Sequence, residues 1–197
     1  MKRLILFLCF SLAVSAFSFG QSDTDTVAIV HLHRTEQVTV RQLRNYVSWH
    51  TINKSRSTGN PNAVLTESER RQVLDILVNV FLVVQAATQE GMAISDSEFN
   101  REFEQWISAL TAALVQRMER PIDADVDAAI LWQTGMTREI FRVFWRREMI
   151  VQNYVLRKFP GITTEEEFVK AGEELVADLR RRGSVQIIED TYNRITW

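Results

Sequence analysis

The chain has 197 residues, with 23 Lys or Arg, 25 Asp or Glu and a formal net charge of −2. This slightly acidic balance excludes a basic nucleic-acid-binding domain. The single cysteine, Cys9, excludes an intrachain disulfide, and its position in an N-terminal apolar run argues against a catalytic or metal-binding thiol.

Residues 1–20 have the three-part pattern of a secretory signal peptide. Lys2 and Arg3 give a positively charged start, residues 4–14 are apolar apart from one serine, and small residues precede Gln21. We therefore expect cleavage near position 20 and a periplasmic mature protein. A retained membrane anchor is the alternative, although the apolar run is shorter than the ~20 residues that a span needs.

The mature protein, residues 21–197, would contain no cysteine. Loss of Lys2 and Arg3 would leave 21 basic and 25 acidic residues. An exported chain without disulfides depends on its hydrophobic core, and a segment of this length can bury one as a single domain.

The mature chain starts with a predicted hairpin and a helix. Residues 26–32 are rich in β-branched side chains and are followed by a polar turn and a second short apolar stretch. Thr39 and Gln42 form a capping box that starts a helix, which we expect to end near residue 51. Residues 53–64 are polar and include glycine and proline, so we expect a mobile loop there.

A second capping box, Thr66 with Glu69, predicts the start of the next helix. Residues 73–87 are apolar on nearly every side, which is typical of a helix buried among others. A membrane span is the weaker alternative, because the run is short and contains three polar residues. These residues are Asp75, Asn79 and Gln85. Gly91 is expected to end this helix.

Ser95 and Glu98 predict a further helix start, after which apolar residues recur at helical spacing. This stripe consists of Phe99, Phe103, Trp106, Leu110, Leu114 and Met118. Pro121 is expected to end the helix. Residues 123–133 predict a short helix that Gly135 ends.

Two more helices and a strand complete the chain. A long helix is predicted from Thr137 to about residue 158. Its apolar side consists of Phe141, Phe144, Trp145, Val151 and Val155. The last helix runs from Thr164 to Arg182, and its acidic start and basic end suit the helix dipole. We interpret both charged runs as helix ends and not as binding sites.

The final strand, predicted over residues 184–188, needs a partner, because a single strand is not stable alone. The simplest arrangement pairs it with residues 26–32. We therefore predict a mainly α protein in which a small β-sheet joins the N-terminal and C-terminal strands. The helix and strand over 164–190 would complete this single domain.

The search for chemistry indicates a binding protein and not an enzyme. His31 and His33 would share one face of a strand, but a typical metal site needs three or four ligands. We therefore expect no metal and interpret both as exposed polar residues. The sequence has no glycine-rich phosphate loop, nucleophile elbow or His-x-x-x-His pair. These observations favour a protein without a catalytic site or cofactor.

Large apolar side chains are the remaining candidates for a binding surface. Most are expected in the core, because such residues are usually buried. Aromatic residues offer contact area at low entropic cost, and methionine adapts to varied partners. The candidates for binding peptides are Trp106, Met118, Trp132 and Trp145.

The order of four segments resembles the chaperone module of the periplasmic SurA family and its PpiC/PrsA-like relatives. Residues 27–47 look like the family's opening strands and helix, and residues 65–105 like its central helix pair. Residues 135–159 and 166–190 look like its following helix and its closing helix and strand. One departure is the His31–Glu36 turn, where relatives commonly have an Asn-Gly type.

The resemblance implies the chaperone half of this family without its enzyme half. Many relatives carry a parvulin prolyl isomerase domain between the long helix and the closing helix, whereas this chain has only the joint at 160–163. We therefore expect an ATP-independent holdase that binds unfolded, aromatic-rich segments of envelope proteins during outer-membrane protein biogenesis. The alternatives are an envelope assembly adaptor with one dedicated partner, a homodimer included, and a peptidyl-prolyl isomerase.

Overall fold

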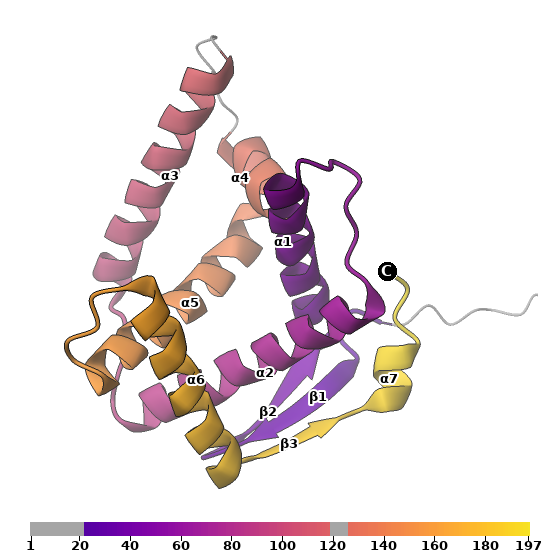
Figure 1. Ribbon diagram of the computed structural model, residues 1–197, viewed down its shortest axis with the longest axis vertical. Coiled ribbons are helices and arrows are strands. Elements are labelled where there is room, and N and C mark those ends of the chain that lie inside the picture. The colour runs from indigo at the N-terminus through magenta and orange to yellow at the C-terminus, as the bar shows by residue number, and fades with distance from the viewer. Residues whose placement is uncertain (1–21, 119–125) are drawn as a thin grey trace, which may run out of the picture.

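The structure is a computed structural model that describes residues 22–118 and 126–197, without the side chains of 113–118. The described part of the chain forms seven helices and a three-stranded sheet (Figure 1). The elements are β1 (Thr26–His31), β2 (Thr35–Thr39), α1 (Val40–Thr58), α2 (Glu67–Gln89), α3 (Asp96–Met118), α4 (Val126–Thr134), α5 (Arg138–Lys158), α6 (Glu165–Arg182), β3 (Ser184–Ile187) and α7 (Glu189–Asn193). The mainly helical fold predicted from the sequence is confirmed. The predicted signal peptide and Pro121 lie outside the described residues.

The sheet is antiparallel with the order β2-β1-β3, so the predicted pairing of the N-terminal and C-terminal strands is confirmed. Ala28 on β1 is paired with Val38 on β2 and with Ile187 on β3. The last strand is one residue shorter than predicted. Ile188 nevertheless donates its backbone N–H to the Val27 carbonyl at 2.9 Å.

One face of this sheet packs on helices, and the other is partly exposed. Helix α2 lies across the sheet (Figure 1), and Ala28 and Val30 are fully buried. Ile29 points to the opposite face, because successive side chains alternate along a strand. Its two cross-strand partners, Gln37 and Gln186, are exposed.

Helix α2 is the core helix predicted from its apolar run. In the described part of the chain it alone is long and apolar enough to cross a membrane, but 61% of its apolar window is buried inside the protein. Its end is a Schellman motif, in which Met92 donates to the Ala87 carbonyl at 2.9 Å and Gly91 to the Thr88 carbonyl at 3.0 Å. Gly91 has a φ of 74°, which a side chain would oppose.

Gln85 is the buried polar residue that joins α2 to the hairpin. It is 2% exposed, and its Oε1 accepts three backbone N–H groups from the β1–β2 turn. The donors are Leu32 at 3.1 Å, His33 at 3.2 Å and Arg34 at 3.4 Å. The Gln85 amide N–H₂ donates to the Val30 carbonyl at 3.4 Å. One amide therefore supplies partners that the tight turn does not provide internally.

The other two polar residues of the α2 apolar run hold the closing helix. Arg180 of α6 donates through Nε to Asn79 Oδ1 at 2.7 Å and through Nη2 to Asp75 Oδ1 at 3.0 Å. Arg180 therefore belongs to the α2–α6 interface, in addition to marking a helix end. Its neighbours Arg181 and Arg182 pair with Asp178 within their own helix.

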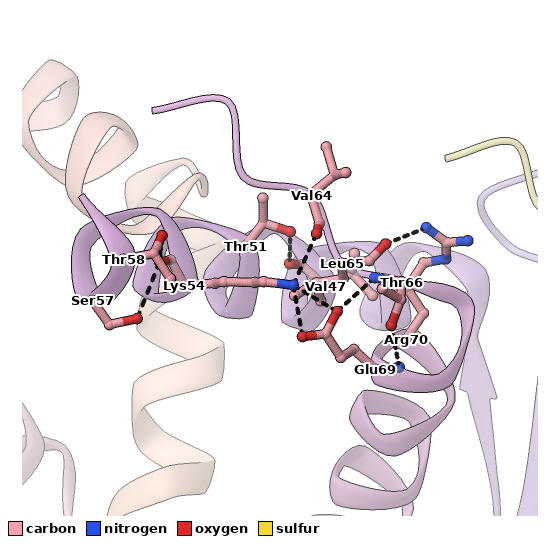
Figure 2. Close-up of polar contacts among 10 residues, drawn as sticks. All are labelled: Val47, Thr51, Lys54, Ser57, Thr58, Val64, Leu65, Thr66, Glu69 and Arg70. Atoms are coloured by element: carbon pink, nitrogen blue, oxygen red, sulfur yellow. Dashed lines mark hydrogen bonds and ion pairs between the residues drawn. The ribbon is translucent and has the colours of Figure 1, made fainter. Parts of the chain in front are cut away.

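Helix α1 is longer than predicted, because residues 53–58 are helical and only the stretch between Gly59 and Thr66 connects it to α2. Figure 2 shows the cause, a network around Lys54. The Lys54 ammonium donates to the Val64 carbonyl at 3.2 Å and to both carboxylate oxygens of Glu69 at 2.7 Å. These contacts fix the last turns of α1 against the start of α2.

Glu69 serves two functions in this network. Its carboxylate also accepts the Thr66 backbone N–H and completes the capping box predicted for α2. The hydrogen bond from Lys54, together with that from Thr66, lowers the pKa of Glu69 to about 2. The loop predicted from the polar composition of residues 53–58 is therefore wrong. A polar segment can be helical when a residue distant in sequence holds it in place.

The C-terminal end also contains an element that the sequence analysis did not predict. Helix α7 follows β3 and packs on α2 through Arg71, which pairs with Glu189 and lies 4.6 Å from the Tyr192 ring centroid. Tyr192 and Ile195 are buried. Short helices of this kind lack the apolar periodicity that identifies longer ones.

We predict that Gln85→Met lowers the free energy of unfolding by about 1–3 kcal/mol, because three backbone N–H groups of the turn lose their acceptor. Gln89→Met is the matched control, since Gln89 is exposed at the end of the same helix. Chemical denaturation of the three proteins measures the difference. Equal losses for both variants would show that the buried amide contributes nothing specific.

Gly183 lies where the chain leaves α6 and enters β3. A Cβ atom there would lie 2.7 Å from the His31 carbonyl oxygen, closer than such atoms approach. Gly183→Ala should therefore push β3 away from β1 and cost about 1–3 kcal/mol. Gly172→Ala is the control, because a Cβ within α6 meets no atom within 4 Å and should stabilise the helix by about 0.5–1 kcal/mol. Thermal unfolding should shift in opposite directions for the two variants.

Candidate peptide-binding groove

Helices α1, α3 and α5 meet at a cluster of aromatic rings. Its members are Tyr46, Trp49, Phe99, Phe103, Trp106, Phe141, Phe144 and Trp145. Phe141 of α5 is fully buried at its centre, with the Trp106 ring of α3 at a centroid distance of 4.6 Å and the Trp49 ring of α1 at 6.2 Å. This cluster makes α5 the helix that connects the other two.

A ladder of polar contacts sets the register of α3 on α5. Three arginines spaced four residues apart on α5 meet three polar side chains spaced four residues apart on α3. The pairs are Arg138 with Glu104 at 3.4 Å, Arg142 with Asn100 at 2.6 Å, and Arg146 with Asp96 at 2.6 Å. The guanidinium groups of Arg142 and Arg146 also lie 4.9 and 4.4 Å from the Phe99 ring centroid. The two helices are therefore fixed antiparallel by stacking as well as charge.

The structure places the four peptide-binding candidates in different environments. Trp106 and Trp145 both belong to the aromatic cluster and are partly buried, and their ring centroids lie 5.9 Å apart. Trp132 lies on α4, is 58% exposed and is covered on one side by the Arg56 guanidinium at 5.2 Å. The side chain of Met118 is outside the described residues. Their role in binding stays a prediction.

A groove lies between the N-terminal halves of α1 and α5, with a volume of about 290 Å³. It is lined by Arg41, Gln42, Asn45, Tyr46, Glu139, Ile140, Val143, Phe144 and Arg147. Tyr46, Ile140, Val143 and Phe144 make its surface apolar, and the other five side chains give it a polar rim. Val143 is 58% exposed, so this apolar surface is accessible to a ligand.

Helical spacing explains how the sequence builds the groove. Ile140, Val143 and Arg147 lie three and four residues apart on α5 and therefore share one face of that helix. Arg41 and Asn45, four residues apart, form the facing row on α1. The two helix starts are fixed by threonine side chains, as predicted.

A partly buried hydrogen bond supports the Tyr46 side of the groove. The Tyr46 hydroxyl donates to Glu148 Oε1 at 2.7 Å, and its ring meets Phe144 edge-on at 4.9 Å. Burial raises the pKa of the Tyr46 hydroxyl and also raises that of the Glu148 carboxyl. The pair therefore orients the tyrosine ring and favours its neutral form.

Basic side chains dominate the charge at the rim. Within the described residues Arg147 has no carboxylate oxygen within 4 Å, although it interacts electrostatically with Glu148. Its guanidinium lies 4.6 Å from the Phe81 ring centroid. Asp23 is shared by Arg44, which it contacts closely, and Arg41, whose Nε lies 3.7 Å from it. The groove thus combines an apolar surface with partly uncompensated positive charge.

The arrangement offers an apolar surface with a polar rim. Over residues 22–118 and 126–197, no group of three or more His, Cys, Asp or Glu side chains is placed to hold a metal. His31, which the sequence analysis interprets as an exposed polar residue, shares a hydrogen bond with Thr35 Oγ1 at 3.1 Å through Nδ1.

The groove is not predicted from the sequence. The apolar side predicted for this helix is its buried side, where Phe141, Phe144 and Val155 are indeed buried. The available signal was the pair Ile140 and Val143, which are apolar but lie beside that stripe. Apolar residues on the flank of an amphipathic helix indicate either a wider core or an exposed binding surface, and periodicity does not distinguish them.

No protein-family model and no curated protein matches this chain.

We predict that Glu148→Gln stabilises the protein at neutral pH. An amide accepts the same hydrogen bond from Tyr46 but carries no charge to bury. Since the folded-state pKa of Glu148 is raised, the carboxylate contributes a cost that grows as pH rises from its unfolded value through its folded value. Stability measured from pH 4 to pH 8 should therefore fall less for the variant. Glu173→Gln, at an exposed position on α6, is the control.

Proposed function

We propose that this chain is an exported, ATP-independent chaperone that holds unfolded segments of envelope proteins, and that the α1–α5 groove is one place where these segments bind. The observation that carries the proposal is the exposed apolar surface around Val143, bordered by polar side chains. Exposed apolar surface with a polar rim is typical of a binding site.

The size of the groove suits weak binding of side chains. Its volume of about 290 Å³ is near the lower limit for ligand pockets, so it fits one or two side chains and not a folded surface. Burial of one large apolar side chain contributes about 1.5–3 kcal/mol. Binding of this strength is reversible without ATP. A holdase requires such reversibility, because it must release the segments that it binds.

The topology supports the same proposal. The antiparallel pairing of β1 with β3 is the arrangement implied by the resemblance to the SurA family. The chain passes from α5, which ends at Lys158, to α6, which begins at Glu165, in a few residues, so no isomerase domain intervenes. We therefore propose chaperone activity without prolyl isomerisation, and expect no acceleration of proline-limited refolding.

An assembly adaptor with one dedicated partner is the second candidate, and a different surface favours it. Leu131 and Trp132 on α4 are 51% and 58% exposed beside the exposed residue Ala128. Spacing of three and four residues places these side chains on one face of the helix. An apolar helix face of this kind fits a fixed partner or a second copy of the chain.

We predict that the mature protein at equimolar concentration suppresses aggregation of an unfolded outer-membrane protein, measured by light scattering. Val143→Asp should lose at least half of this effect, because a charge then occupies the apolar surface. Val169→Asp is the matched control, since Val169 is 52% exposed on α6, outside the groove.

Equal aggregation with and without the wild-type protein would contradict the proposed chaperone function. Photo-crosslinking from Val143 and Trp132 in the native envelope distinguishes the two candidates. Capture of many unfolded proteins at Val143 supports a chaperone, whereas capture of one folded protein at Trp132 alone supports an adaptor.

A further inference from the structure

We propose that the α1–α5 groove selects peptide segments in which an acidic side chain lies close to an apolar one. This inference rests on the proposed function, since it names the class of segment that the groove would bind. The apolar side chain would occupy the surface formed by Tyr46, Ile140, Val143 and Phe144, and the carboxylate would meet the basic rim.

Arg147 is the cation best placed to meet a carboxylate. It lines the groove, and within the described residues it has no acidic partner within 4 Å. Its guanidinium lies over the face of Phe81 at 4.6 Å. Stacking uses the face of this planar group and leaves N–H donors at its edge, which fit the two oxygens of a carboxylate.

Arg41 provides a second cation on the opposite wall. It competes with Arg44 for Asp23, and the Arg44 contact is the shorter of the two. One carboxylate therefore faces two guanidinium groups. A second carboxylate, brought by a bound segment, would balance the charge that remains.

Two acidic side chains near the groove offset only part of this charge. Glu139 belongs to the rim, and hydrogen bonds from its own backbone N–H and the Thr137 hydroxyl lower the pKa of its carboxyl. Its carboxylate lies in the first turn of α5, where it suits the helix dipole. Glu148 lies outside the groove lining, accepts a hydrogen bond from the Tyr46 hydroxyl and interacts electrostatically with Arg147. Burial raises the pKa of the Glu148 carboxyl, which disfavours its charged form.

Three fluorescein-labelled unstructured peptides test the inference. They share one sequence with a central leucine or phenylalanine and differ only in its neighbours, which are aspartate, asparagine or lysine. We expect the aspartate peptide to bind about threefold to tenfold more tightly than the asparagine peptide by fluorescence anisotropy. The lysine peptide should bind most weakly. These differences should shrink between about 0.05 M and 0.5 M salt.

Variants connect this preference to the rim. Arg147→Gln should abolish most of the difference between the aspartate and asparagine peptides while leaving binding of the asparagine peptide nearly unchanged. Arg157→Gln, at an exposed position of the same helix outside the groove, should keep the difference. Arg41→Gln gives a second test on the other wall, should loss of stacking on Phe81 unfold the first variant.

The outcomes separate this inference from the function on which it rests. Equal affinity for all three peptides, or a preference that survives in both Arg147→Gln and Arg41→Gln, overturns the acidic selection but leaves the aggregation result intact. Absence of binding by every peptide, together with no suppression of aggregation, overturns both.

Discussion

The fold depends on the contact between one buried amide and a three-residue turn. Gln85 lies in the middle of an apolar helix, and it is stable there because every polar atom of its side chain has a backbone partner in the hairpin. The hairpin depends on the same contact, since three successive N–H groups of its turn donate to that one oxygen. A buried amide that satisfies several groups at once favours one register, because a shifted strand would leave those groups unpaired.

Once the hairpin is fixed on α2, the remaining contacts follow from the position of β1. As the central strand, β1 has a partner on each edge. The partner on the second edge is β3, which directly follows α6 in the chain. That helix is held by Arg180 on Asp75 and Asn79, so the polar residues of α2 hold both the hairpin and the closing helix. Asp75, Asn79 and Gln85 also explain why a helix of nearly membrane-like hydropathy belongs to a packed core. Each lies opposite a specific polar partner, an arrangement that lipid does not offer.

The sequence predicts most of this architecture where the signal is local. Capping boxes at Thr39 and Thr66 place two helix starts correctly, because cap chemistry involves residues only three positions apart. Prediction from the sequence fails where contact with a residue distant in sequence determines the structure. The end of α1 depends on Lys54 meeting Glu69, and α7 depends on Arg71, neither of which periodicity reveals. The groove is not predicted from the sequence for a related reason. The exposure of Val143 depends on the separation between the first turns of α1 and α5, and the aromatic cluster sets that separation.

Helix α5 shows why a folding constraint and the proposed binding surface can coexist on one element. Its buried stripe meets α1 and α3 through Phe141, and its arginine ladder fixes α3, so its orientation is over-determined by contacts on two sides. The flank that carries Ile140, Val143 and Arg147 takes no part in that ladder. Side chains on this flank are therefore free to contact a ligand while the helix stays in place. A rigid helix that presents an apolar flank loses little conformational entropy on binding, and this compensates in part for the small contact area of the groove.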